Sequence, residues 1–285
     1  MYTTGIDPAF EHYLRDIPGL TYASDDQHWL ARSVTRSVEA VLGRRRLEGL
    51  YWELKNERLT SQEFLIQALA RSGIHIDADY SPLATLDTSR PTLFLANHPF
   101  GVIDGLVLCN IALRAAGDFR VVINSLLCQD RELARHFLPI DFAGTREAER
   151  RNVRAKQLAS EALKNGIPLV LFPSGMVSTA GRFGLGSVHD GRWTTFAAKL
   201  VRQHQPTIVP VYFHGQNSRP FHIASHVAEP LRMAMLMHEA LRLFGKTIKV
   251  DIGDPLSSES YAHIEGRQAL TEFLYQSVQD TARIA

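Results

Sequence analysis

The stretch that most constrains the fold is residues 92–105, where a short apolar run changes abruptly into a polar loop. Residues 92–96 (TLFLA) are almost entirely apolar, which is typical of a strand buried on both faces of a sheet. The loop that follows carries Asn, His, Pro and Gly, and Asp104 stands at its end, beside a new apolar segment. Because α/β folds place their chemistry where a strand ends in a polar, glycine-containing turn, we predict a functional site there.

Beyond this loop the chain alternates between strand-like and helix-like segments. The strand-like segments are short, apolar and rich in β-branched residues, whereas the helix-like segments are longer. This alternation predicts an α/β fold with a mostly parallel or mixed sheet flanked by helices. The predicted strands are residues 119–124, 168–172, 207–213 and 247–252, and a brief extended piece covers 138–142. The predicted helices are residues 105–116, 131–137, 145–165, 193–203, 234–244 and 266–282.

Residues 1–90 have a different character, and we expect them to form an N-terminal helical region ahead of the α/β domain over residues 91–285. Residues 27–55 carry apolar side chains at helical spacing with arginines between them, and the glycines near the middle allow two helices as readily as one. The capping-box sequence that begins at Thr60 predicts a further helix over residues 64–71. The basic amphipathic pattern suits a membrane surface, and it equally suits a helix with one face on the core and a solvated arginine face.

Composition limits the classes of function and the compartment. The 285 residues are 45% hydrophobic, which suits a globular protein, and the net charge of +1 provides no basic field for binding nucleic acid. Cys109 and Cys128 both lie in apolar segments, as expected for free thiols in a reducing compartment. We find neither a signal-peptide pattern nor an uninterrupted apolar run of about 18 residues, so we expect a cytoplasmic protein.

His98 and Asp104 are the candidate catalytic pair. An imidazole is a useful general base when a carboxylate holds one ring nitrogen and the other nitrogen faces a reacting hydroxyl. Pro99 and Gly101 lie between the two residues and allow the chain to turn so that they face each other. Two other interpretations remain open. One is a metal site, for which one His and one Asp are an incomplete ligand set, and the other is a loop histidine beside an aspartate that caps a helix.

Several common site signatures are absent from the sequence. There is no GxSxG motif, which disfavours a serine hydrolase with a nucleophile elbow. Residues 184–189 lack the third glycine of a dinucleotide-binding loop and do not directly follow a strand. No GxxxxGK[ST] phosphate loop is present, and the remaining histidines lack the spacing of a zinc-binding helix. These exclusions leave His98 and Asp104 as the leading candidates.

Four short sequence blocks, taken together in their order along the chain, identify a family more specifically than any one block does. They are Asn97-His98…Asp104, residues 139–142 (PIDF), residues 172–175 (FPSG) and residues 208–211 (IVPV). In order, spacing and strand context they resemble the motifs of the glycerolipid acyltransferase family, which includes the lysophosphatidic acid acyltransferases. The resemblance covers about residues 91–215 and implies the α/β fold of that family.

The details resemble one subgroup of that family. The subgroup carries NHPxGxxDG, as residues 97–105 do here, and it is associated with ornithine- or glycine-lipid synthesis and with haemolysin-like proteins. It also shows FP-small-G-x-VS and Gly-x-Asn-Ser, which match residues 172–178 and 215–218. The His–Asp spacing of this subgroup, with five intervening residues instead of four, is the spacing of His98 and Asp104.

Three departures from the wider family bear on the acceptor. Ser174 stands where the family's FPEG has glutamate, Met176 and Val177 replace the Thr-Arg that follows, and Phe142 replaces the arginine after Ile-Asp. In the family, these arginines bind the phosphate of the acceptor. This sequence lacks them, so the resemblance favours a lyso-lipid with another head group. The candidates to replace them, each of which also suits a solvated surface, are Arg146, Arg150, Arg182 and Arg192.

The resemblance implies transfer of an acyl group from a thioester, acyl-CoA or acyl carrier protein, to the hydroxyl of a lyso-lipid acceptor. His98 would take the proton from that hydroxyl, Asp104 would orient the imidazole, and backbone N–H groups near Gly175 would stabilise the oxyanion. No metal or cofactor is implied, and the expected location is peripheral, on the inner face of the cell membrane. The residues expected to bind substrate are Asn97, Gly101, Arg146, Phe172, Pro173, Ser174, Gly175 and Arg182.

Two other functions are compatible with the same residues. Ser174 and Met176, in place of the family's residues, suit a non-catalytic lipid-binding relative, although His98 and Asp104 argue against it. A hydrolase of acyl thioesters needs the same base, acting on water instead of an acceptor hydroxyl. The identity of the product separates the three possibilities.

Overall fold

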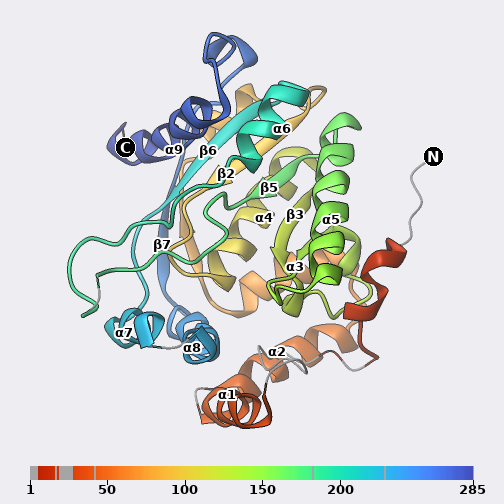
Figure 1. Cartoon of the computed structure of the whole chain (residues 1–285), viewed down its shortest axis with the longest axis vertical. Coiled ribbons are helices and arrows are strands. Elements are labelled where there is room, and N and C mark those ends of the chain that lie inside the picture. Colours follow the sequence, from red (N-terminus) through yellow and green to blue (C-terminus); the bar gives the residue numbers. More distant parts are fainter. Residues whose placement is uncertain are drawn as a thin grey trace.

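The computed structural model describes residues 6–16, 18, 28–41, 43–181, 183–227 and 229–284. Its centre is a seven-stranded sheet with the strand order β1-β7-β6-β2-β5-β3-β4, and helices cover both faces (Figure 1). The strands are β1 (His75–Asp77), β2 (Thr92–Ala96), β3 (Arg120–Asn124), β4 (Phe137–Ile140), β5 (Leu169–Leu171), β6 (Thr207–Phe213) and β7 (Thr247–Ile252). The α-helices are α1 (Trp29–Val41), α2 (Arg44–Asn56), α3 (Ser61–Arg71), α4 (Val102–Ala116), α5 (Arg146–Lys164), α6 (Phe196–His204), α7 (Arg219–Val227), α8 (Glu229–Arg242) and α9 (Arg267–Ile284). Short 3₁₀ turns cover Pro8–Tyr13, Ser81–Thr85, Ser125–Leu127, Ala134–His136 and Ser258–Ser260.

The sheet is mixed and mostly parallel, as predicted. β2 pairs in parallel with β5 and β6, and β3 pairs in parallel with β5 and β4. β7 runs antiparallel to β6, and the edge strand β1 runs parallel to β7. Leu95 lies beside Leu171 on one side and Pro210 on the other, so the carboxyl ends of β2, β5 and β6 lie close to one level. The loops that leave these strands therefore meet at one edge, where open α/β sheets bind their ligands.

Each face of the sheet has its own hydrophobic core. Side chains alternate along β2, so Phe94 and Ala96 pack on one face with residues of α3, α4 and α8. Leu93 and Leu95 pack on the other face with residues of α5, α6 and α9. All five residues of β2 are buried, which explains why the strand is a continuous apolar run instead of an alternating one. The loop that follows β2 thus starts from a strand held on both faces.

Most of the predicted elements are present, and one is wrong. The strands predicted at 207–213 and 247–252 coincide with β6 and β7. A helix was expected over residues 131–137, but only the 3₁₀ turn Ala134–His136 forms before the chain enters β4. β4 pairs with β3 along its whole length, and this pairing outweighs a short, weak helical pattern.

β1 and α7 lie outside the predictions. β1 is three residues long and partly exposed, which is too short for a strand period to show. It pairs with β7 and so connects the N-terminal residues to the sheet. α7 begins with Arg219-Pro220, and proline at a helix start normally marks a turn as readily as a helix.

The N-terminal helices follow the predicted pattern with a break. Gly43 has a φ of 100°, a left-handed conformation that glycine adopts without strain, and it separates α1 from α2. Thr60 and Glu63 form the predicted capping box, in which each side chain accepts the other residue's backbone N–H. Over the described ranges, no helix combines the length and the apolar character needed to cross a membrane.

Candidate active site

The loop after β2 is anchored to β6 by the side chain of Asn97. Its Nδ2 donates to the Phe213 carbonyl at 3.0 Å, and its Oδ1 accepts the Phe213 N–H at 2.8 Å. These two bonds extend the pairing of β2 with β6 just beyond Ala96 and Val211. Asn97, which is predicted to bind substrate, therefore fixes the start of residues 97–104, which we call the His98 turn.

His98 and Asp104 meet, as their spacing predicts. Nδ1 of His98 lies 3.0 Å from Oδ1 of Asp104. The separation suits a hydrogen bond, but Nδ1 has no aligned acceptor, so the contact is an electrostatic one with imperfect hydrogen-bond geometry. Catalytic pairs in ligand-free sites are commonly misaligned and tighten when substrate binds. The imidazole is 18% exposed, and the carboxylate is fully buried.

Asp104 lies in the first turn of α4 and also serves that helix. Its Oδ2 accepts the Phe100 N–H at 2.8 Å, and its Oδ1 accepts the Gly105 N–H at 3.0 Å. A carboxylate at a helix N-terminus is stabilised by unpaired N–H groups and by the helix dipole. The two interpretations of Asp104, a helix cap and a group that orients His98, are thus compatible. The helix holds the carboxylate, and the carboxylate faces the imidazole.

Backbone and ring contacts hold His98 in place. Its N–H donates to Oδ1 of Asp190 at 3.1 Å, and its carbonyl accepts the Ser178 N–H at 2.8 Å. The imidazole stacks on the Phe172 ring, with the ring centroids 4.1 Å apart and the planes at 25°. Phe172, predicted to bind substrate, therefore packs against the candidate base. With Nδ1 beside Asp104, Nε2 is the nitrogen left to accept a proton.

Asp190 is a positioning residue that the sequence motifs do not indicate. Besides the His98 N–H, its carboxylate accepts the Ser178 hydroxyl, and its Oδ2 accepts Nε1–H of Trp193 at 3.0 Å. These bonds connect the loop before α6 to the His98 turn. Asp190 lies in a glycine-rich segment far from His98 along the chain, so no local spacing relates the two.

Some backbone N–H groups at the turn after β5 have no acceptor among the described residues. The Gly175 N–H donates to the Phe172 carbonyl, and the Met176 N–H donates to the hydroxyl of Ser174. The amide of Gly175 itself therefore closes the turn. The Val177 N–H has no acceptor among the described residues, and its neighbour Ser178 is bonded to His98.

Pro173 and Ser174, both predicted to bind substrate, contact the protein's own backbone. The Pro173 carbonyl accepts the Thr194 N–H at 3.0 Å. The Ser174 hydroxyl donates to the Met176 carbonyl at 2.8 Å. Both residues are buried, so they shape the turn beside His98 from within.

Two glycines allow the loops around His98 to approach each other closely. Gly101 has a φ of 86°, and a Cβ there would lie 3.0 Å from Cδ2 of Leu236. Gly215 has a φ of 116°, and a Cβ there would lie 2.6 Å from the Phe100 ring. Other residues would be strained at both positions and would displace the His98 turn. Gly101 is predicted to bind substrate, and its positive φ and its close neighbours explain why glycine is needed at this position.

Asn217, in the loop between β6 and α7, is buried with an unpaired amide. Neither its Oδ1 nor its Nδ2 has a hydrogen-bond partner within the described part of the chain. Buried polar groups are almost always paired, so an unpaired amide calls for a ligand or a bound water. The next residue, Ser218, is fully engaged, because its N–H and its hydroxyl both bind the buried Glu239 carboxylate. Asn217 is therefore a candidate for substrate contact, which the Gly-x-Asn-Ser motif alone does not establish.

A second His–carboxylate pair lies at the end of the neighbouring strand. Nε2 of His214, just after β6, is hydrogen-bonded to Oδ2 of Asp251 on β7. The His214 ring also meets the Tyr212 ring edge-on, with the centroids 5.0 Å apart. Like the His98–Asp104 pair, this pair consists of a histidine and an aspartate, but it lies outside the motifs that resemble the family. It therefore offers a matched control for mutagenesis.

A small polar cavity adjoins the His98 turn. Its volume of about 30 Å³ has room for water but not for a lipid chain. The chains of a lipid substrate must therefore lie elsewhere on the protein. The cavity is lined by Asn97, Pro99, Ser178, Val188, His189, Asp190, Tyr212, Gly215, Tyr275 and Gln279.

Three of the four arginines predicted to bind a head group are described, and all three are exposed on the surface. Arg146 begins α5 and is exposed. It follows β4, which lies three strands from β2 in the sheet order, or about 14 Å at the usual strand spacing. Arg150 is also exposed, and exposed Arg192 follows Gly191, which lies beside Met176. Arg182 lies outside the described residues.

Neither cysteine is placed for covalent catalysis. Cys109 and Cys128 are buried, and burial raises the pKa of each thiol, so the reactive thiolate is disfavoured. Among the described residues, no group of three or more His, Cys, Asp or Glu side chains is arranged to hold a metal ion. The described groups at the site are thus a histidine beside a carboxylate, together with backbone dipoles.

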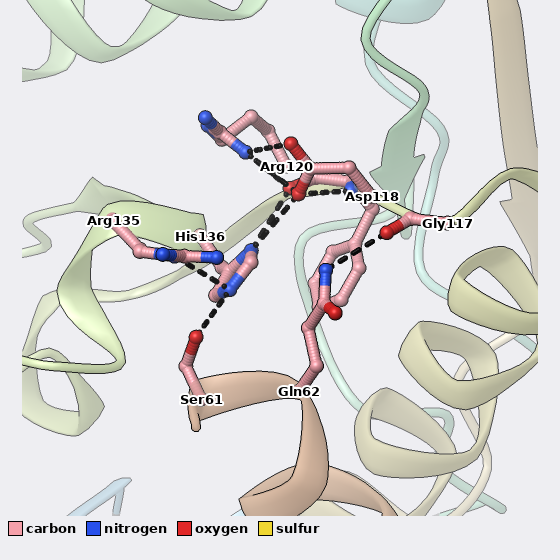
Figure 2. Close-up of polar contacts among 8 residues, drawn as sticks. Ser61, Gln62, Gly117, Asp118, Arg120, Arg135 and His136 are labelled. Atoms are coloured by element: carbon pink, nitrogen blue, oxygen red, sulfur yellow. Dashed lines mark hydrogen bonds and ion pairs between the residues drawn. The ribbon is translucent and has the colours of Figure 1, made fainter. Parts of the chain in front are cut away.

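A separate cluster places Ser61, His136 and Asp118 in the order of a hydrolase triad (Figure 2). The Ser61 hydroxyl lies 2.9 Å from Nε2 of His136, and Oδ1 of Asp118 lies 3.4 Å from Nδ1. Nε2 also accepts Nε–H of Arg135 at 3.1 Å, so its lone pair is already engaged. Ser61 and His136 are both buried. The cluster therefore fastens the start of α3 to the chain around β3 and β4.

Asp118 makes this cluster a source of pH-dependent stability. Burial raises the pKa of Asp118, but the hydrogen bond from His136 and the charge of Arg120 outweigh it and lower the pKa to about 2. A carboxyl with a depressed folded pKa stabilises the fold above its unfolded pKa of about 3.9, and this stability disappears as the pH falls through the folded value.

Asp118→Asn is accordingly expected to lower the free energy of unfolding at neutral pH by less than about 1 kcal/mol, since the carboxylate is 42% exposed. The difference from the parent should shrink as the pH falls from about 4 toward about 2. Urea unfolding of both proteins across this range measures it. A difference that stays constant with pH would contradict the assignment.

Comparison with known proteins reveals relatives of this chain. A family model described as Acyltransferase matches residues 15–277. A lyso-glycine lipid O-acyltransferase of Phocaeicola vulgatus is 28% identical over 187 residues, which cover 63% of this chain and 64% of that protein. A protein of the same name from Bacteroides thetaiotaomicron is 28% identical over 176 residues, which cover 59% of this chain and 61% of that protein. The matched segments thus span about three-fifths of the length of these relatives.

A solved structure has a similar fold. The 1-acyl-sn-glycerophosphate (LPA) acyltransferase PlsC of Thermotoga maritima superposes with a TM-score of 0.50 at 16% sequence identity. The superposition covers 84% of this chain and 82% of the PlsC chain. This likeness is one of fold, a mixed sheet flanked by helices.

Proposed function

The chain belongs to the acyltransferase family whose model spans residues 15–277, and from this premise we propose that it is an O-acyltransferase acting on a lyso-lipid. The reaction moves a fatty acyl group from an acyl thioester, on coenzyme A or acyl carrier protein, to a hydroxyl of the lyso-lipid. The observation that supports the proposal most is the 3.0 Å contact of His98 with Asp104 at the carboxyl end of the central strand β2.

In the proposed reaction, Nε2 of His98 takes the proton of the acceptor hydroxyl as the hydroxyl oxygen attacks the thioester carbonyl carbon. The Asp104 carboxylate beside Nδ1 favours the tautomer with Nε2 unprotonated and offsets the charge of the imidazolium. The tetrahedral intermediate collapses with cleavage of the C–S bond, and the leaving thiolate takes the proton from Nε2. The lyso-lipid becomes an ester, and the base returns to its starting state without an acyl-enzyme.

The backbone N–H of Val177 is the proposed donor to the oxyanion. It lacks an acceptor among the described residues, whereas the N–H groups on both sides of it are bonded. The bond from Ser178 to the His98 carbonyl fixes this amide close to the base before substrate arrives. Preorganised donors of this kind contribute about two to three orders of magnitude to the rate of acyl transfer.

We propose that the acceptor is built on an amino acid. The relatives from Phocaeicola vulgatus and Bacteroides thetaiotaomicron are named for lyso-glycine lipids. Glycine has no hydroxyl, so an O-acyl acceptor based on it must carry the hydroxyl on its fatty chain, which glycine's nitrogen can hold through an amide. Phe142, Met176 and Val177, which replace the family's phosphate-binding residues, also favour such an acceptor over a glycerol phosphate.

The buried amide of Asn217 is proposed to recognise the amide bond of this acceptor. An asparagine side chain offers both donors and an acceptor, which complement the C=O and N–H of an amide. Asn217→Leu keeps a similar volume and removes an unpaired polar group, so we expect unchanged or slightly higher thermal stability. Its kcat/KM for the acceptor is expected to fall by up to about tenfold, the value of one hydrogen bond.

Steady-state kinetics with varied acceptor, together with thermal unfolding, measure both effects of Asn217→Leu. Asn217→Gln keeps the amide and controls for the loss of polarity. An unchanged kcat/KM for the Asn217→Leu protein would remove Asn217 from the acceptor site.

A lipid acceptor supports a peripheral location at a membrane, on the cytoplasmic face where thioester donors are found. α1 and α2 are the proposed points of contact, because they are rich in arginine and α1 begins with the exposed Trp29 and Leu30. This assignment adds no residue to the catalytic step. It allows a protein whose cavity at the His98 turn is too small for a lipid chain to act on long-chain lipids.

The product distinguishes the proposed function from its alternatives. Purified protein is incubated with a long-chain acyl thioester, alone or with a lyso-aminolipid or lysophosphatidic acid, and free thiol is followed. Thiol release that requires an acceptor supports acyl transfer, and the better acceptor identifies the head group. Release without any acceptor indicates a hydrolase, and no release with lipid bound indicates a binding protein.

A further inference from the structure

Five large apolar side chains are exposed on the loop after β5 and on α7. Clusters of this kind on a protein surface usually mark a contact with a partner or a lipid. The loop carries Phe183, which is 72% exposed, and Leu185, which is 58% exposed. We call the whole set the apolar rim, and its members are Met176, Phe183, Leu185, Ile223 and Val227.

Contacts at two places hold the loop that carries Phe183 and Leu185 against α7, which carries Ile223 and Val227. Nε of Arg219 donates to the Phe183 carbonyl at 3.3 Å, and a Cβ on Gly184 would lie 2.8 Å from Cγ of Arg219. At the other end of α7, Nε2 of His226 is hydrogen-bonded to the Ala180 carbonyl at 2.9 Å. The loop therefore lies along the length of the helix.

The helical period of α7 separates a buried face from the rim. Phe221 and Ala224 are buried, whereas Ile223 and Val227 are exposed and four residues apart, so these two share one outward face. Arg219 lies four residues before Ile223 on the same face and is also exposed. The exposed face of α7 is thus apolar with a cation at its start.

The apolar rim lies next to the His98 turn and at the same end of the protein as α1. Met176 follows the turn after β5, and Ser178, two residues on, bonds to His98. α1 packs on α8 and α8 packs on α7, and Figure 1 shows these three helices together at one end of the molecule. The exposed Trp29 of α1 therefore belongs to the same end as the rim.

The charges around the apolar rim favour an anionic surface. Asp190 is the only acidic residue in the sequence between residues 176 and 227. Its carboxylate already accepts three hydrogen bonds within the protein. Arg192 and Arg219 are exposed in the same segment. An anionic surface would thus meet cations at the rim and no exposed carboxylate from these residues.

We propose that the apolar rim inserts into the interfacial layer of an anionic lipid bilayer and forms a second membrane contact besides the N-terminal helices. The inference rests on the proposed function, since a lyso-lipid acceptor resides in that layer. A rim beside the His98 turn lets the acceptor hydroxyl reach His98 while its chain remains in the bilayer. This agrees with the cavity at the turn, whose volume of about 30 Å³ is too small for a lipid chain.

Leu185→Ser and Val153→Ser form a matched pair for testing the rim. The two side chains are 58% and 55% exposed, and Val153 lies on α5, on the side of the molecule away from the rim (Figure 1). Cosedimentation of purified protein with vesicles of anionic phospholipid, without substrates, measures a partition coefficient.

We expect a several-fold lower partition coefficient for Leu185→Ser and at least about a tenfold loss for Phe183→Ser with Leu185→Ser, because two apolar side chains leave the interface. Val153→Ser should bind as the parent does. Transfer to a short-chain acceptor dissolved as monomers should be unchanged in every variant, which also shows that the variants are folded.

Equal partitioning of the double variant and the parent would overturn the proposal, as would a parent that does not bind anionic vesicles. A lipid-free dimer that the double variant loses in sedimentation velocity would assign the rim to a contact between copies and would also overturn it. Failure of the proposed function is recognised separately. Vesicle binding that depends on the rim, without acyl transfer, would support the membrane contact and reject the acyltransferase function. Acyl transfer together with vesicle binding that does not depend on the rim would support the acyltransferase function and reject the membrane contact.

Discussion

His98→Ala is expected to lower kcat for acyl transfer by about two to four orders of magnitude, because a positioned general base contributes about that much. The imidazole has the required setting. Nδ1 lies 3.0 Å from a buried carboxylate, the ring stacks on Phe172, and Nε2 is left to meet the acceptor hydroxyl. Acceptor-dependent thiol release under saturating substrate measures the loss.

The fold is expected to tolerate the loss of the His98 imidazole. The hydrogen bonds of residue 98 to Asp190 and Ser178 use its backbone N–H and carbonyl, which alanine retains. Circular dichroism and the thermal midpoint should therefore match the parent closely. His214→Ala is the matched control, since it removes a histidine paired with a carboxylate at the next strand end. A His98→Ala protein that keeps most of its activity, or a His214→Ala protein that loses as much, would reject the general-base role.

Asp104→Asn is expected to lower kcat by about two to four orders of magnitude, as is found when the carboxylate of such a pair is neutralised. An amide offers one acceptor oxygen and one NH₂ donor in place of two acceptor oxygens. If the oxygen keeps the Phe100 N–H, the NH₂ group faces Nδ1 of His98 and favours the tautomer with a protonated Nε2. That tautomer cannot take a proton from the acceptor.

A stability measurement separates the catalytic and capping roles of Asp104. Asp104 accepts two backbone N–H groups while fully buried, and Asn removes the acceptor of the Gly105 N–H, which keeps a longer bond to the Gly101 carbonyl at 3.3 Å, so we expect a cost of about 1 kcal/mol. Activity is therefore compared at a temperature where both proteins are folded, with Asp251→Asn as the control pair. Equal rates for Asp104→Asn and the parent would leave Asp104 as a helix cap alone.

The sheet could be predicted where burial leaves a strong pattern. β2 and β6 can be located from continuous apolar runs, because strands buried on both faces need such residues, and β7 can be located from its alternating β-branched residues. β1 could not be predicted, because three partly exposed residues are too few to show the alternation of a strand. The sequence predicts a helix over residues 131–137 because local spacing does not show that β4 pairs with β3.

The contact between His98 and Asp104 could be predicted because the two residues are close in sequence. His98 and Asp104 are separated by one turn, and that turn must bend them together once α4 begins at Val102. The predicted helix began at residue 105, so Asp104 was placed before the helix instead of in its first turn. The local pattern thus predicted the contact and missed the element that secures it.

The residues that hold the site from a distance could not be predicted in the same way. Asp190 supports the His98 backbone from 92 positions away along the chain, and the Asn97 side chain bonds the backbone of a strand 116 positions away. Such partners are brought together only by the parallel strand order. Asn97 and Phe172, both predicted to bind substrate, also contact the protein itself, and these contacts cannot be read from the motifs.

The most direct test of the central claim is the molar ratio of lipid ester formed to thiol released. Purified protein receives a long-chain acyl thioester and an N-(hydroxyacyl)glycine, and mass spectrometry quantifies the O-acylated product beside the thiol. The account predicts a ratio of one to one in the parent and neither product above background in the His98→Ala protein. Thiol release without the ester, or ester formed equally well without His98, would contradict it.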